Sequence, residues 1–252
     1  MKHSEEEERT NLMQLPTLVD LLEAGAHFGH ETSKWNPKMK KYIFTVRNHV
    51  HVLDLQETLK SLETAAAFAS GIAARGGLVL FVGTKRQARN IVKEQAERCG
   101  MPFITTRWLG GTFTNFETIL KSITKMETLR NLLASPDAET LTKKERSVIK
   151  NEIKGLEEVL QGLKELRKLP GAVFLVGAHN EKIAAKEALR RKVPTIAMVD
   201  TNANPEDIDY PIPANDDAVR SLEIVVKTIA DAIIEGKRSV AVPDATVQMV
   251  KG

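Results

Sequence analysis

Apolar runs alternate with amphipathic stretches along most of the chain. The runs at 78–82, 172–176 and 194–199 are apolar at nearly every position, a pattern typical of strands buried on both faces. In the stretches that follow each run, apolar residues recur at helical spacing. Because strands that alternate with helices form parallel sheets covered on both sides, we predict an α/β fold with a doubly wound, Rossmann- or flavodoxin-like sheet.

A different apolar pattern lies between residues 117 and 168. Apolar residues recur there at alternating spacings of four and three, which is a heptad seam: Ile149, Ile153, Leu156, Leu160 and Leu163. A similar stripe covers 119–133, residues 135–137 interrupt it, and Thr142 with Glu145 has the form of a capping box that starts a new helix. We therefore predict an inserted antiparallel coiled-coil hairpin. No reactive side chains gather there, which favours an interaction arm or a spacer over an enzyme lid.

These patterns divide the 252 residues into segments. We expect the sheet domain at 18–116 and 169–236, and the helical hairpin at 117–168. The acidic leader 1–17 is expected to be disordered, and 237–252 to be a C-terminal tail. Hydrophobic residues make up 42% of the chain, which is enough for a substantial core.

Composition and charge pattern exclude several classes of protein. The longest uncharged stretch, 169–180, is far shorter than the ~20 residues that a membrane helix needs. The charged first residues have no apolar run behind them, so we expect no secretory signal. The single cysteine, Cys99, excludes an intrachain disulfide and suits a reducing cytoplasm.

The net charge of only +3 is an average over segments of opposite sign. Residues 32–53 carry five cations and no acid, residues 75–107 carry seven cations and two acids, and residues 200–217 carry acids without a cation. Aromatic and amide side chains lie among the cations of 32–53, a combination that suits phosphate contact together with stacking on bases. A solvated charged face is the alternative interpretation.

Three segments supply the candidate RNA-binding residues. The first is 32–53, and the second is the turn after the strand at 78–82, where a helix N-terminus can hold phosphate. The third is 107–115, where adjacent glycines expose the backbone. The candidates are Lys34, Trp35, Asn36, Lys38, Lys40, Lys41, Arg47, Lys85, Arg86, Arg89, Arg107, Trp108 and Asn115. A tight turn with solvated cations and a hinge below the hairpin are the alternatives for the last two segments.

The sequence offers little support for enzyme chemistry. Gly83 and Lys85 fit neither the glycine fingerprint of dinucleotide-binding proteins nor the P-loop, and there is no nucleophile elbow. His27 and His30 can share a metal only if the acidic segment 200–217 folds onto them, so we expect no metal site. That segment is typical mainly of turns and helix caps. We expect no cofactor, no small-molecule substrate and no membrane contact.

Several segments match those of a known family in the same order. They are Leu22-Glu-Ala-Gly-Ala-His-Phe-Gly-His30, Trp35-Asn-Pro-Lys-Met39, Phe81-Val-Gly-Thr-Lys-Arg-Gln87, Arg107-Trp-Leu-Gly-Gly111, Val199-Asp-Thr-Asn202 and Asp209-Tyr-Pro-Ile-Pro-Ala-Asn-Asp-Asp217. Over about 18–235 the chain resembles the bacterial ribosomal protein S2 family. The resemblance implies a non-enzymatic constituent of the cytoplasmic small ribosomal subunit. It also implies binding to small-subunit rRNA where the head meets the body, and contacts with other small-subunit proteins, among them ribosomal protein S1, which gathers mRNA for translation.

Two other functions remain as alternatives. An α/β enzyme could use the doubly wound sheet for a nucleotide or sugar phosphate, but the missing glycine fingerprint argues against it. A protein-only scaffold would act through the helical hairpin and would not need the basic segments.

Overall fold

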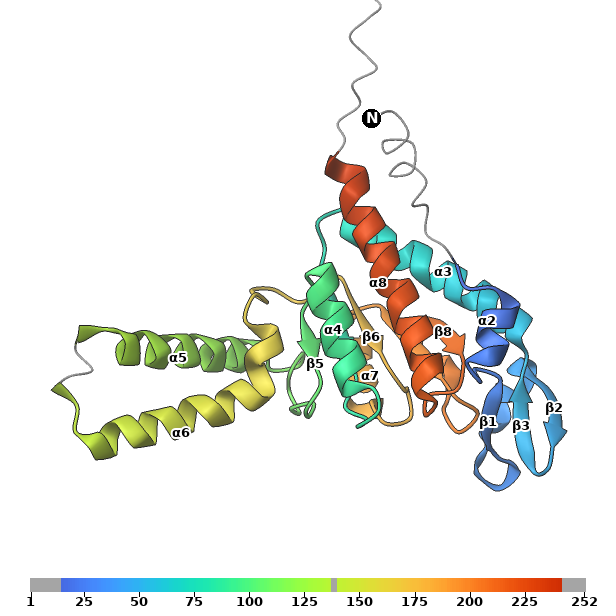
Figure 1. The fold of residues 1–252 in the computed structure, drawn as a ribbon, viewed down its shortest axis with the longest axis horizontal. Coiled ribbons are helices and arrows are strands. Elements are labelled where there is room, and N and C mark those ends of the chain that lie inside the picture. The colour runs from blue at the N-terminus through green and yellow to red at the C-terminus, as the bar shows by residue number, and fades with distance from the viewer. Residues whose placement is uncertain (1–14, 137–139, 242–252) are drawn as a thin grey trace, which may run out of the picture.

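The computed structural model describes residues 15–136 and 140–241. The leader up to residue 14 and the tail from residue 242 lie outside the described residues, and so do most of the expectations for them. Two boundaries differ: Thr17 already caps the first helix, and the last helix continues to Ala241, past the expected start of the tail at 237. A central parallel sheet carries helices on both faces (Figure 1). A helical hairpin extends from one end of the molecule, and a small antiparallel sheet lies at the other end.

The central sheet has five strands, all parallel. They are β4 (Val79–Val82), β5 (Phe103–Ile104), β6 (Ala172–Leu175), β7 (Thr195–Val199) and β8 (Tyr210–Pro213). Their order is β5-β4-β6-β7-β8. β5 lies on one side of β4, and β6, β7 and β8 follow one another on the other side. This is the flavodoxin-like order, and it confirms the predicted α/β sheet.

The last strand, β8, was not expected, because its sequence is typical of a turn. Pro211 and Pro213 lie inside it, and proline lacks the N–H that a central strand donates. β8 pairs only with β7 and forms the edge of the sheet, where such residues are tolerated.

Helices cover both faces of the central sheet. On one face, α3 (Leu55–Ala74), α4 (Arg89–Cys99) and α8 (Val219–Ala241) enclose a large apolar core. On the other face, α7 (Lys182–Arg191) and the base of the hairpin enclose a second core. Alternate strand residues point into the two cores, which explains why the strands are apolar at nearly every position.

The small sheet precedes the central sheet in the chain. Its elements are α2 (Leu18–Glu23), β1 (Phe28–Glu31), η1 (Thr32–Lys34), η2 (Pro37–Tyr42), β2 (Ile43–Arg47) and β3 (Val50–Leu53). The strands are antiparallel in the order β1-β3-β2, and two 3-10 helices, η1 and η2, connect β1 to β2. The residues at 42–46 and 50–53 are mostly β-branched or aromatic, which is typical of strands, and they coincide with β2 and β3.

Two helices project from the central sheet as a hairpin (Figure 1). They are α5 (Phe116–Ala134) and α6 (Lys143–Leu160), and η4 (Gln161–Leu163) leads the chain back. Thr142 caps α6 and forms with Glu145 the capping box that the sequence predicts. Two ion pairs join the helices: Lys125 with Glu152, and Arg130 with Glu157.

Candidate nucleic-acid interface

The cations of the first candidate segment lie on the small sheet and its 3-10 helices. Lys34, Lys38, Lys40, Lys41 and Arg47 are all exposed. Lys34 Nζ lies 3.6 Å from Glu31 Oε2, and Lys38 pairs with Glu206 of η5 (Pro205–Asp207). The other three cations form no ion pair with a carboxylate of the described residues.

Asn36 and Trp35 both make contacts within the protein. The side-chain oxygen of Asn36 accepts a hydrogen bond from the N–H of Lys38 at 3.0 Å, and its own N–H donates to the carbonyl of Thr201 at 2.7 Å. These bonds start η2 and anchor it to the loop after β7. Trp35 is half-buried, with its ring centroid 5.0 Å from that of His51. Asn36 therefore supports the fold, whereas Trp35 is only partly covered by the protein.

The three candidates in and after the turn that follows β4 differ in exposure. Arg86 and Arg89 are exposed. The side chain of Lys85 is only 9% exposed, and its Nζ lies 2.5 Å from Asp216 Oδ1 and 2.8 Å from Asp217 Oδ1. The geometry gives Lys85 an internal ion pair in place of the expected phosphate contact.

The third candidate segment is the loop after β5. Arg107 and Asn115 are exposed there, whereas Trp108 is only 8% exposed. The indole ring packs edge-on against Phe113 with the centroids 5.0 Å apart, and its Nε1 donates to Glu187 Oε1 at 3.2 Å. A buried ring is not available to stack on a base, so Trp108 supports the loop in place of the expected RNA contact.

Glu187 of α7 holds this loop in position. Its carboxylate accepts hydrogen bonds from the backbone N–H groups of Gly111, Phe113 and Thr114 at 2.7, 2.9 and 3.2 Å. The Thr114 hydroxyl and the Trp108 indole donate to the same carboxylate. Burial raises the pKa of Glu187, but the hydrogen bonds outweigh it, so the pKa lies below its usual value.

Glu181, at the start of α7, holds the turn after β4 in the same way. Its Oε1 accepts hydrogen bonds from the N–H and the hydroxyl of Thr84, both at 2.7 Å, and burial raises its pKa. Sequence reasoning missed both glutamates, although a signal exists. They share the inward side of α7 with the buried Ala184 and Ala188, and a buried acid needs hydrogen-bond donors.

Five titratable side chains gather beside the carboxyl ends of the central strands. We call them the switch-point cluster: His30, Lys85, Asp200, Asp216 and Asp217. In open α/β sheets this is where ligands bind, beside the strands at which the order reverses. Gly177, directly after β6, has a φ of +101°, and an added Cβ would lie 2.8 Å from Asp216 Oδ2. Only glycine therefore fits against the cluster at this position.

The two basic groups of the switch-point cluster offset part of the charge of its three carboxylates. His30 Nδ1 lies 3.1 Å from Asp200 Oδ1, and this contact raises the pKa of His30. Burial and the nearby Asp200 raise the pKa of Asp216 to about 6, although Lys85 acts in the opposite direction. Burial lowers the pKa of Lys85, but Asp216 and Asp217 outweigh it and keep the ammonium charged. Because three carboxylates surround the position, a substrate phosphate would be repelled there.

Four members of the cluster can hold a metal ion. His30, Asp200, Asp216 and Asp217 offer ligand atoms that lie within 4.8 Å of one another. Asp216 Oδ2 is buried and has no hydrogen-bond partner among the described residues. Imidazole and carboxylate donors together suit zinc. The sequence predicts no metal site, because the acidic segment lies far from His30 in the chain. The fold brings three aspartates of that segment next to His30, whereas His27 is not part of the group.

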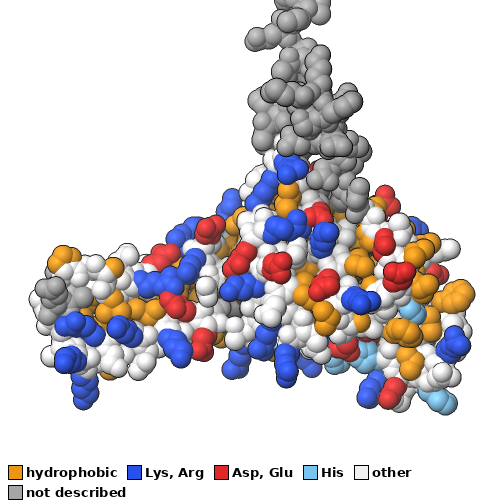
Figure 2. All heavy atoms as spheres, viewed as in Figure 1, with side chains coloured by type: hydrophobic (Ala, Val, Ile, Leu, Met, Phe, Trp, Pro, Cys, Tyr) orange, Lys and Arg blue, Asp and Glu red, His pale blue; other side chains and the backbone are white. Residues whose placement is uncertain are grey.

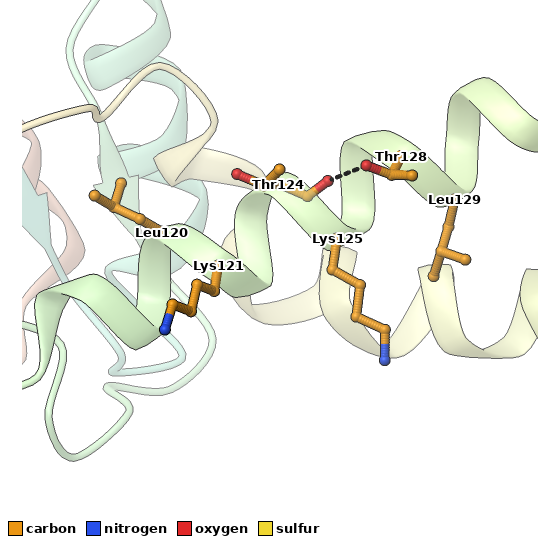
Figure 3. A pocket seen from close by; sticks show the side chains of 6 residues that line it. All are labelled: Leu120, Lys121, Thr124, Lys125, Thr128 and Leu129. Carbon is orange, nitrogen blue, oxygen red and sulfur yellow. Dashed lines mark hydrogen bonds between the residues drawn. The ribbon is translucent and has the colours of Figure 1, made fainter.

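A groove of about 490 Å³ runs along α5 of the hairpin (Figure 3). Its lining residues are Leu120, Lys121, Thr124, Lys125, Thr128 and Leu129. The Thr128 hydroxyl donates to the carbonyl of Thr124 at 2.9 Å, and Lys125 pairs with Glu152. No carboxylate, imidazole or thiol lines the groove, so it offers no group for acid–base chemistry.

The fold and these sites define a flavodoxin-like α/β protein that fills its ligand position with its own charged side chains and presents exposed cations on its loops. Within the described residues, no helix is long and apolar enough to span a membrane. The family model described as Ribosomal protein S2 matches residues 21–236. The chain therefore belongs to the ribosomal protein S2 family, whose members are structural, non-enzymatic proteins of the small ribosomal subunit in translation.

Proposed function

We propose that the chain binds small-subunit rRNA, near the junction of head and body, through cations of the small sheet and of the loops after β4 and β5. The observation that carries the proposal is the exposure of Lys40, Lys41 and Arg47, which form no ion pair among the described residues. Such cations can neutralise phosphates and release counterions, whereas Lys85 is already neutralised. Trp35 lies in the same segment and is partly exposed, so we propose it as a ring for stacking on a base. The other proposed contacts are Lys34, Lys38, Arg86, Arg89, Arg107 and Asn115.

Reversing two of these charges tests the rRNA proposal. We expect Lys40→Glu combined with Lys41→Glu to weaken binding to protein-free small-subunit rRNA, because two phosphate contacts are lost. The slope of log affinity against log salt should fall by roughly 0.7–0.9 per contact, thus by about 1.5 in total. Filter binding of the full chain at several salt concentrations measures both quantities.

The control for this variant reverses two exposed cations on another helix. Arg220 and Lys227 both lie on α8, and both are exposed and outside the proposed surface. Arg220→Glu with Lys227→Glu changes the net charge equally and should retain the wild-type slope. Equal slopes for the two variants would remove the small sheet from the proposed interface.

An apolar patch beside the small sheet supports a second part of the function. Hydrophobic side chains gather at the end of the molecule where α2 and the small sheet lie (Figure 2). The docking patch consists of Leu18, Val19, Leu22, Phe28, Phe44 and Val46, which are 40–74% exposed. A groove of about 440 Å³ runs between α2, β2 and β3. Contiguous exposed apolar surface marks protein-binding sites, and we assign this patch to ribosomal protein S1.

Substitution of Phe44 tests the docking patch. Phe44 is 74% exposed, so Phe44→Asp should leave the fold intact and weaken binding of purified ribosomal protein S1 by ~30-fold, the effect of losing one aromatic anchor. Val148 on α6 is 58% exposed, and Val148→Asp is the matched control. If both variants capture S1 as the wild type does, the patch has another role.

A further inference from the structure

Helix α7 presents a surface that carries only positive charge. Residues 179–192 contain five cations and two acids, a net charge of +3 in sequence. The two acids, Glu181 and Glu187, are only 3% and 6% exposed and accept hydrogen bonds from inside the protein. The cations are all exposed: Lys182, Lys186, Arg190, Arg191 and Lys192. Folding therefore converts a mixed segment into a face with five positive charges and no acid of its own.

The cations of α7 are regularly spaced and unpaired. Lys182, Lys186 and Arg190 lie four residues apart, so they share one side of the helix at intervals of about 6 Å along its axis. None of the five cations forms an ion pair with a carboxylate of the described residues. The loop after β5 is bonded to α7 through Glu187, and it carries the exposed Arg107 next to Trp108.

We propose that the outer face of α7 binds the phosphate backbone of RNA, as a second contact surface besides the small sheet. The inference rests on the proposed rRNA binding and adds a separate site to it. A row of unpaired cations matches a chain of phosphates. α7 also exposes the apolar Ile183 and Leu189, which suit a protein partner, but five unpaired cations with no exposed acid among them match phosphate better. Glu187 and Glu181 act as positioning residues that fix α7 to the loops after β5 and β4.

The test removes the regularly spaced cations from the full chain. In the variant Lys182→Gln, Lys186→Gln and Arg190→Gln, we expect weaker binding to protein-free small-subunit rRNA. The slope of log affinity against log salt should fall by roughly 2–3, because each phosphate contact contributes about 0.7–0.9. The changed residues are exposed, so a thermal melt should match that of the wild type.

A matched control removes the same number of positive charges from another part of the surface. The variant Arg220→Gln, Lys227→Gln and Arg238→Gln removes three exposed cations from α8, which covers the other face of the sheet. We expect this variant to keep the wild-type slope.

The outcomes separate the inference from the function on which it rests. If the wild-type chain itself does not bind the rRNA, the proposed function fails. If the wild type binds and the α7 variant keeps the slope and affinity of the control, only the α7 inference is overturned. If the α7 variant binds naked rRNA normally but no longer joins small subunits, the partner of α7 is a protein, and the RNA assignment is likewise overturned.

Discussion

Replacing Glu187 by alanine should lower the free energy of unfolding by about 3 kcal/mol, because several buried donors lose one shared acceptor and each unsatisfied buried donor costs about 1–3 kcal/mol. The substitution leaves the N–H groups of Gly111, Phe113 and Thr114 and the Trp108 indole without their acceptor. Water cannot easily replace the carboxylate, because Glu187 is only 6% exposed. Urea unfolding followed by circular dichroism measures the loss.

Glu187→Gln separates the charge from the shape of the side chain. Glutamine keeps the volume but turns one of the two acceptor oxygens into an NH₂ donor that faces other donors, so we expect a loss of about 2 kcal/mol at pH 7. The pKa of Glu187 is lower in the folded state than its ordinary value of 4.5, so its stabilising contribution is complete above that pH. It disappears as the pH falls through the folded-state pKa. The difference between wild type and Glu187→Gln should therefore narrow as the pH is lowered from 7 towards 3.

The control for Glu187 is its neighbour on the outer side of α7. Lys186 is exposed, and Lys186→Ala should change the stability by less than about 0.5 kcal/mol. A Glu187→Ala variant as stable as Lys186→Ala would show that the five hydrogen bonds contribute little. A gap between wild type and Glu187→Gln that stays constant with pH would show that the charge of the carboxylate is unimportant.

Replacing Lys85 by methionine should also lower the free energy of unfolding by about 3–5 kcal/mol, because a buried ion pair loses one partner. Lys85 Nζ contacts the carboxylates of Asp216 and Asp217 and the backbone carbonyl of Asp216. Without the ammonium, three aspartates of the switch-point cluster face only the imidazole of His30. Methionine retains most of the aliphatic volume, so the change isolates the charge.

Thermal and urea unfolding of Lys85→Met can be compared with those of Arg86→Met. Arg86 is adjacent in the chain but exposed, so its replacement should change the stability by less than about 0.5 kcal/mol. If both variants unfold at the same urea concentration, Lys85 is not the counter-charge of the cluster. Unchanged rRNA affinity in a folded Lys85→Met variant would agree with its internal position.

The main elements of the fold could be predicted because their signals are local. Strands β4, β6 and β7 are continuous apolar runs, and α3 and α8 show helical periodicity over many residues. β8 could not be predicted, since its prolines are acceptable only at a sheet edge, and the position of a strand in a sheet is not a local property.

The candidate site was predictable only in part, because a charge has a different role inside and outside the protein. The sequence identifies the exposed cations Lys40, Lys41 and Arg47 correctly as surface residues. It predicts Lys85 and Trp108 as RNA-binding residues in the same way. Both are nearly buried, however, and their partners are more than 70 residues away in the chain. Residue type and spacing contain no information about such distant partners.

The sequence alone determined the class of fold, the membership of the ribosomal protein S2 family and the sign of each charged segment. Periodicity and motif order depend on neighbouring residues, which is why they are visible in one chain. The tertiary structure decided which charges face outward. The side chains of Glu181 and Glu187 are buried on the inner side of α7. Lys85 is neutralised by aspartates that lie 131 and 132 residues further along the chain. Burial and pairing depend on contacts across the fold, and these determine where the protein presents positive charge on its surface.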